Sequence, residues 1–306
     1  MNRIANCCLV TSLVALCAAC AGENAQNLAA KLDSALKSGD MDAALALLDG
    51  RGLPGEVKFF YMDLVPDCFE HLTCTVTAGP VTDEYKKEMA EQKQSQGLEV
   101  APEPEGILLI KQEGEKEHGK MELPFAKVDG KYKVIAARYS AQKLGALKAQ
   151  TGQTLADEAL ATGMQTMAGD LNSEWKTNAK ALAAGGGDAG AAFVASTNAM
   201  AKAAKANDVN AMIAAGGEWA AVVFRDKDFD GKPVSLHRRE LKMRAQAVRQ
   251  LADVEVLGGY QQGDVAIITF QGHDGAGWVV RGFKVMENKD NRWDGIGGNQ
   301  VSVPPT

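Results

Sequence analysis

The sequence predicts an α+β protein made of two similar helix-and-antiparallel-sheet units in tandem, placed after an N-terminal export signal. Helical apolar periodicity opens each half of the chain, and alternating apolar periodicity closes it. The same turn signals also recur in both halves in the same order. We interpret this recurrence as a duplication, which predicts the same strand order in both units.

Each unit begins with two helices separated by a short turn. In the first unit, Leu28, Leu32 and Leu36 follow helical spacing, and the turn after them ends at Asp40. In the second unit, an alanine-rich helix from about Phe193 leads to Asp208 at the matching place. Each aspartate can accept hydrogen bonds from the free N–H groups of the next helix, so both are predicted N-caps.

Each unit ends in strands joined by tight turns. Apolar runs at 107–110 and 265–270 predict strands, and the pairs at 129–130 and 290–291 predict two-residue hairpin turns. The large aromatic side chains, Trp219 among them, are expected to face the cores. A charged stretch at 82–105 is expected to form a solvated helix and loop inserted into the first unit.

These signals divide the chain into four parts. Residues 1–20 are expected to be a signal peptide, residues 24–140 the first unit, residues 141–190 a helical and glycine-rich linker, and residues 191–306 the second unit. A chain of 306 residues is long enough for two domains that each bury a core.

The first 20 residues have the layout of a signal peptide, with Arg3 followed by a charge-free apolar run that ends at Cys20. The run is too short for a membrane-spanning helix. The small residues before Cys20 resemble a lipobox, although Cys17 stands where a lipobox usually has leucine. We expect export to the cell envelope with a lipid on Cys20 as the only membrane contact. Cleavage at the small residues around Cys20 by an ordinary signal peptidase is the alternative, and it would give a soluble secreted or periplasmic protein.

Of the six cysteines, only Cys68 and Cys74 lie outside the export signal. Their short spacing permits a disulfide that closes a small loop, and an oxidising compartment would keep it. Two unpaired thiols are the alternative.

The net charge of −6 argues against nucleic acid as a partner. Proteins that bind nucleic acid concentrate lysine and arginine to displace counterions from the phosphate backbone.

The order of these signals resembles the nuclear transport factor two-like superfamily, in which a capped helix pair and a third helix precede an antiparallel sheet. The run at 129–134 and the pair at 292–293 carry the resemblance at the strand ends, and it covers most of both units. This superfamily includes the SnoaL-like cyclases and many exported bacterial lipoproteins. The resemblance implies that each unit is a cystatin-like cone, with helices wrapped against a curved sheet. In such a cone the mouth holds a ligand, or carboxylates and histidines in the enzymatic members.

Two residues are candidates for acid–base catalysis in such a cone, Glu218 on the third helical stretch and His237 within a charged group. General acid–base catalysis requires an enclosed group with a shifted pKa. Ordinary ion pairing at the surface is the alternative interpretation of both residues.

One stretch resembles the start of a calcium-binding loop. Asp226, Asp228 and Asp230 precede Gly231 with the alternate spacing at which carboxylates converge on a hard cation. His237 stands where an EF-hand loop requires glutamate, so an exposed acidic turn is the alternative. The sequence contains no phosphate-binding glycine loop or nucleophile elbow, and no cofactor other than calcium is expected.

Three hypotheses about function follow. The preferred one is a non-catalytic envelope lipoprotein that binds a small ligand, a peptide or an envelope partner through one or both cones. The second is a SnoaL-like enzyme of the isomerase, cyclase or hydrolase type, with a carboxylate or histidine in the cone. The third is a structural surface module stabilised by calcium.

Overall fold

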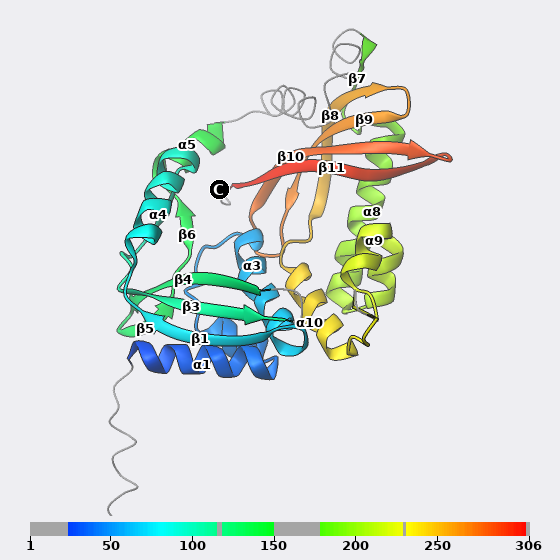
Figure 1. Ribbon diagram of the computed structural model, residues 1–306. Helices are drawn as coiled ribbons and strands as arrows, with labels where there is room; N and C mark the ends of the chain where they lie inside the picture. Colours follow the sequence, from blue (N-terminus) through cyan, green and yellow to red (C-terminus); the bar gives the residue numbers. More distant parts are fainter. Residues whose placement is uncertain (1–23, 115–117, 150–177, 229–230, 304–306) are drawn as a thin grey trace, which may run out of the picture.

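The computed structural model describes residues 24–114, 118–149, 178–228 and 231–303, so the predicted signal peptide and Cys20 lie outside the described residues. The described chain combines helices with antiparallel sheets, one of them curled into a half-barrel, and the predicted α+β class is confirmed (Figure 1). The cone shape of the two units stays a prediction. No described helix has the length and apolar composition that a bilayer crossing needs.

Each described half places three helices before its main run of antiparallel strands, and further elements differ between the halves. The first half contains α1 (Ala25–Ser38), α2 (Met41–Ala46), α3 (Gly55–Pro66), the π-helical turn η2 (Asp67–His71), β1 (Thr73–Gly79), α4 (Asp83–Gln96), β2 (Leu98–Val100), β3 (Gly106–Glu113), β4 (His118–Val128), β5 (Lys131–Val134), β6 (Ala137–Tyr139) and α5 (Ala141–Ala149). The second half contains β7 (Lys180–Leu182), α8 (Gly187–Ala206), α9 (Val209–Val223), α10 (Leu236–Ala247), β8 (Ala252–Gln262), β9 (Val265–His273), β10 (Val279–Lys289) and β11 (Arg292–Val303).

Strand order is the same in the two halves. The first sheet has the order β1-β3-β4-β5, and the second has β11-β10-β9-β8-β7, so four antiparallel strands follow three helices in each half. The pair β2-β6 forms a small separate sheet beside the first one. This common order is the arrangement that a duplication predicts.

Local signals form the elements as the sequence predicts. The carboxylates of Asp40 and Asp208 each accept a hydrogen bond from the backbone N–H three residues later, at 2.9 Å, and both predicted N-caps are confirmed. The turn residues Asp129 and Gly130, like Asp290 and Asn291, all have positive φ angles and join paired antiparallel strands. The two predicted hairpin turns are confirmed as well.

The glycines of the expected linker that the structure describes are closely packed. The N–H of Gly185 donates to the carbonyl of Val256 on β8 at 2.9 Å, and α8 already begins at Gly187. A Cβ atom on Gly190 would lie 2.1 Å from the carbonyl oxygen of Gly185. These glycines therefore allow a close approach between the start of α8 and the second sheet. The sequence interpretation had assigned them to a flexible tether.

The core of the first half lies between its sheet and helices α1 and α3. Its most deeply buried members include Leu36, Val65, Leu108 and Ile110. The expected disulfide is present, because Cys68 of η2 is bonded to Cys74 of β1 and both residues are buried. This bond ties the end of α3 to the first strand of the sheet.

Helices α3 and α10 pack against one another, and each has its N-terminus capped from the opposite half. The carboxylate of Asp274, in the β9–β10 hairpin, accepts a hydrogen bond from the N–H of Gly55 at 2.6 Å. The carboxylate of Glu70 accepts one from the N–H of Ser235, the N-cap of α10, at 3.2 Å. Because free N–H groups at a helix start must be satisfied, each half completes a helix of the other.

Charged side chains also cross the contact between α3 and α10. Buried Arg238 donates to the carbonyl of Pro66 at 2.8 Å and lies 3.3 Å from a carboxylate oxygen of Asp67. Lys242 lies 3.0 Å from Asp67 and 3.5 Å from Asp63. Burial raises the pKa of Asp63, and nearby Lys242 opposes that effect only in part. The contact between the halves is therefore polar, and it is made by particular hydrogen bonds and ion pairs.

Candidate functional site

The candidate site begins on the part of α3 that projects beyond the first core. The Phe60 side chain is 47% exposed, although it is large and apolar. Its ring meets the Tyr61 ring edge to face, with centroids 5.3 Å apart. The Tyr61 hydroxyl lies 3.5 Å from the carbonyl oxygen of Ile135, at the upper limit for a hydrogen bond. Burial raises the pKa of Tyr61, so its phenol stays protonated.

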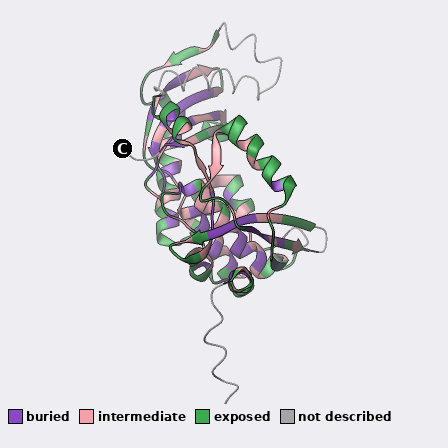
Figure 2. Cartoon of the chain, turned by 90° about the vertical axis from the view of Figure 1, so that its left-hand side faces the viewer, coloured by how far each residue is buried: buried purple, intermediate pink, exposed green. Residues whose placement is uncertain are grey.

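Tyr85 lies on the helix α4. This charged helix is exposed along most of its length (Figure 2), and Tyr85 is its buried residue, with 6% exposed. Burial, with a smaller contribution from Glu122 on β4, raises the pKa of Tyr85 to about 12. The phenol of Tyr85 also contributes to the raised pKa of Tyr61.

The hydroxyl of Tyr85 makes no hydrogen bond to any residue that the structure describes. Among the described residues, the one fully enclosed side-chain polar atom without a hydrogen-bond partner is the Oε1 atom of Gln262. The Tyr85 hydroxyl is therefore not fully enclosed. It reaches solvent, although the ring is buried. Buried tyrosines usually find a partner for this group.

A third tyrosine stands on β6, the strand beside α4. Burial raises the pKa of Tyr139 as well, and its hydroxyl has no hydrogen bond within the described chain. We call Phe60, Tyr61, Tyr85 and Tyr139 the tyrosine site. It combines apolar rings with protonated phenols.

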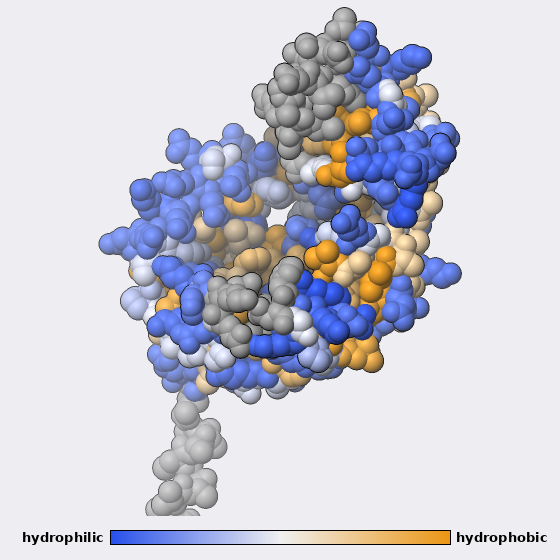
Figure 3. All heavy atoms as spheres, turned by 45° about the vertical axis from the view of Figure 1, so that its right-hand side comes forward, coloured by the Kyte–Doolittle hydropathy of each residue, from blue (hydrophilic) through white to orange (hydrophobic). Residues whose placement is uncertain are grey.

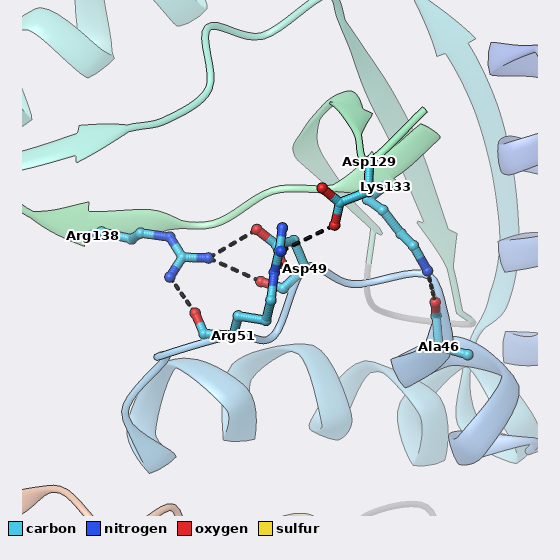
Figure 4. A network of polar contacts seen from close by, with 6 residues as sticks. All are labelled: Ala46, Asp49, Arg51, Asp129, Lys133 and Arg138. Carbon is cyan, nitrogen blue, oxygen red and sulfur yellow. Dashed lines mark hydrogen bonds and ion pairs between the residues drawn. The ribbon is translucent and has the colours of Figure 1, made fainter. Parts of the chain in front are cut away.

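Arg138 fixes the β6 strand to the loop before α3 (Figure 4). Its guanidinium donates to the carbonyl of Arg51, and to the carbonyl and carboxylate of Asp49 at 3.1 Å each. Arg51 in turn pairs with Asp49 at 2.7 Å and with Asp129 at 3.0 Å. These contacts join β6 to the loop that precedes α3.

The molecule is hollowed at its centre. Figure 3 shows an opening between the lobe formed by α4 and α5 and the second half of the chain, with hydrophobic residues gathered on its floor. In Figure 1, α3 lies below this opening and β6 lies beside it, and α5 contacts β11 above it. We call this opening the central hollow. The elements that carry the tyrosine site border it.

The two residues predicted as catalytic candidates are at the surface. Glu218 on α9 and His237 on α10 are both exposed, and the imidazole of His237 packs edge to face on the Phe69 ring at 5.2 Å. Neither side chain has the enclosed surroundings that general acid–base catalysis requires.

Trp219 does not face a core as expected. Its side chain is 43% exposed, because Gly217 breaks the helical geometry of α9 with φ 60° and ψ −142°. The break changes the direction of the residues that follow, so helical spacing counted from Val209 places Trp219 on the wrong face. Trp278 and Phe125, by contrast, are buried as expected.

The structure describes two of the three predicted calcium ligands, Asp226 and Asp228, while Asp230 lies outside the described residues. The Asp228 carboxylate accepts a hydrogen bond from the N–H of Lys232 at 2.8 Å, within a turn closed by a bridge between Lys227 and Pro233. In the described part of the chain no three His, Cys, Asp or Glu side chains are grouped to hold a metal. The calcium site stays a prediction.

One ionisable group in the second half was also missed by the sequence interpretation. Lys284 of β10 is half-buried on the sheet face shared with Met286, and burial lowers the pKa of its amine. A Cβ atom on Gly295 would lie 2.4 Å from its Cε atom, so this glycine makes room for the lysine. No hydrogen bond or ion pair among the described residues places a second polar group beside the Lys284 amine. The tyrosine site, where Phe60 and Tyr61 pack edge to face and the Tyr85 hydroxyl has no partner in the described chain, is the stronger candidate.

Comparison of the chain with protein-family models, with curated proteins and with solved structures finds no match. The function must therefore be argued from the geometry of the site.

Proposed function

We propose that this chain is an exported, lipid-anchored envelope protein that binds a small apolar ligand in the central hollow, at the tyrosine site. The observation that supports it most is Tyr85, whose ring is buried while its hydroxyl has no partner among the described residues. Binding sites for small molecules are mostly apolar, with a few polar groups that orient the ligand. The exposed Phe60 ring and the protonated phenols form such a combination.

Export is supported by the signal-peptide layout of residues 1–20 and by the disulfide between Cys68 and Cys74, which an oxidising compartment would preserve. Lipidation would place the anchor at Cys20, close before α1. Mass spectrometry of the mature N-terminus tests this part of the proposal. A lipidated Cys20 supports it, and a free N-terminus at another residue contradicts it.

Ligand binding is tested with N-phenylnaphthylamine, an uncharged dye whose fluorescence rises in apolar surroundings. The mature protein should bind the dye with saturation. Phe60→Ser should weaken binding about tenfold, because it removes an exposed aromatic contact.

Val222→Ser is the matched control, since Val222 on α9 is 51% exposed and belongs to the second half. It should leave dye binding unchanged. Equal losses in the two variants, or no saturable binding to the wild type, would refute a site at Phe60.

A further inference from the structure

The last strand of the second sheet, β11, has a long outer edge with no strand paired to it in the described chain. It pairs with β10 along one side and ends the sheet (Figure 1). Over residues 292–298 its other side makes no backbone hydrogen bond to any described element. We call this side of residues 292–300 the β11 edge. Because the outward N–H and C=O groups of an edge strand can pair with a further strand, it is a place for strand addition.

The other outer edges of the two larger sheets are covered or short. On β1, the N–H of Val76 donates to the carboxylate of Asp33 on α1 at 3.0 Å. On β5, the N–H of Val134 donates to the carbonyl of Leu47, and its carbonyl accepts from the N–H of Asp49, at 2.8 Å each. β7, at the far end of the second sheet, has three residues. Folded proteins protect sheet edges in these ways, and β11 differs from them.

The side chains of the β11 edge leave room for a second strand. Its charged residues, Arg292 and Asp294, stand at its start, and no charged residue follows them up to Val303. A bulge at Ile296 interrupts the pairing with β10 at one residue and leaves this side chain 51% exposed. A Cβ atom on Gly297 would meet nothing within 4 Å. The middle of the edge is therefore uncharged, open and partly apolar.

A second copy of the chain supplies a well-matched strand. Its β11 is already held extended by β10, whereas a flexible peptide would lose conformational entropy on pairing. Antiparallel pairing about a twofold axis joins the same edge of both copies. With the axis at Gly297, Asp294 lies opposite the uncharged Gln300, so like charges do not meet there. Ile296 of each copy then lies opposite Gly298 of the other, which has no side chain to obstruct it.

We propose that two copies of this chain associate by antiparallel pairing of their β11 edges about Gly297. The pairing would join the second sheets of both copies into one continuous sheet. It does not depend on ligand binding in the central hollow.

Sedimentation velocity of the mature protein over a range of concentrations tests the proposal. The wild type should form a dimer as the concentration rises. Ile296→Lys should weaken the association at least about tenfold, because it removes an apolar contact and brings two like charges together near the axis. Val222→Lys is the matched control, since Val222 on α9 is also 51% exposed, and it should dimerise like the wild type.

Gly297→Cys tests the orientation and register of the pairing. A twofold axis at Gly297 places this residue opposite itself, so the oxidised variant should form a disulfide-linked dimer. The substitution has room, because the Cβ position of Gly297 is open. Val222→Cys should stay unlinked under the same conditions. A dimer that Gly297→Cys does not link would be formed through other contacts, and it overturns the proposal.

Two further results also overturn it. One is a wild type that stays monomeric at every concentration, which leaves the β11 edge to a strand of another protein. The other is equal dimerisation of Ile296→Lys and the wild type. Dye binding at the tyrosine site is measured separately, so failure of the pairing and failure of the proposed function are distinguishable.

Discussion

At the scale of single residues, burial of the tyrosine phenols should be visible in the dependence of stability on pH. Burial raises the pKa of Tyr85 to about 12, while an unfolded tyrosine ionises near pH 10. Since the folded protein holds this proton more tightly, the free energy of unfolding should fall as the pH rises from about 10 to about 12. Solvent screening of the hydroxyl reduces the contribution of this residue to roughly 1–2 kcal/mol. Below about pH 10 the contribution should be constant.

Denaturant unfolding across this pH range, with Tyr85→Phe as the comparison, measures the effect. The variant should lose part of the alkaline decline in stability. Identical pH dependence in both proteins would show that the Tyr85 phenol is solvated.

The disulfide is a second residue-scale feature with a measurable effect. Replacing Cys68 and Cys74 together by serine should lower the free energy of unfolding by about 2 kcal/mol, because the closed loop is short. Unfolding of the reduced wild-type protein provides the control and should match the variant. Unchanged stability after both replacements would mean that η2 and β1 stay together without the bond.

At the scale of elements, the helix caps that cross between the halves make a further prediction. Asp274→Ala removes the acceptor for the Gly55 N–H and for two N–H groups of its own hairpin, those of Ala276 and Trp278. The free energy of unfolding should fall by about 2 kcal/mol. Glu70→Ala removes a single, exposed cap bond to Ser235 and should cost less than about 1 kcal/mol. Equal losses in chemical denaturation would contradict the assignment of Asp274 as a buried cap.

The carboxylates of Asp63 on α3 and Asp67 at the start of η2 should differ in what they contribute to stability. Burial raises the pKa of Asp63, which means that its desolvation outweighs its attraction to Lys242. Asp63→Asn should therefore change stability by less than about 1 kcal/mol. Asp67 contacts both Arg238 and Lys242, so Asp67→Asn should cost about 1–2 kcal/mol by leaving a buried arginine with one partner fewer. A larger loss for Asp63→Asn in thermal or chemical unfolding would reverse this order.

Elements were predictable from the sequence wherever a local signal forms them. Asp40 and Asp208 cap helices through bonds to the next turn, and the hairpin at 129–130 needs only residues that tolerate positive φ angles. Trp219 was placed wrongly because one glycine inside α9 interrupts the periodicity on which the prediction depends. Propensity and spacing cannot show where a helix is broken by its packing.

The candidate site was not predictable in the same way. Tyr85 belongs to a charged helix that the sequence correctly marks as solvated, and its burial depends on Tyr61 and Glu122, which come from other elements. The one available signal was a single large aromatic residue within an otherwise polar stretch. Such a residue is a reason to examine where an insertion folds back onto its domain.

At the scale of the whole molecule, the contact between α3 and α10 makes the two halves depend on each other. The crossed caps and the buried Arg238 leave neither half complete alone. Helix α5 also contacts β11, so the second half meets the lobe of α4 and α5 beside the central hollow (Figure 3). The sequence indicated two units and a repeated order of elements, but the contact surface between them arises from residues more than a hundred positions apart.

A ligand in the central hollow should contact Tyr85. The most direct test is fluorine NMR of the mature protein with a fluorinated tyrosine at position 85, titrated with N-phenylnaphthylamine. The fluorine resonance should shift and saturate together with the rise in dye fluorescence. A resonance that stays unchanged while the dye binds would place the ligand elsewhere and contradict the proposed site.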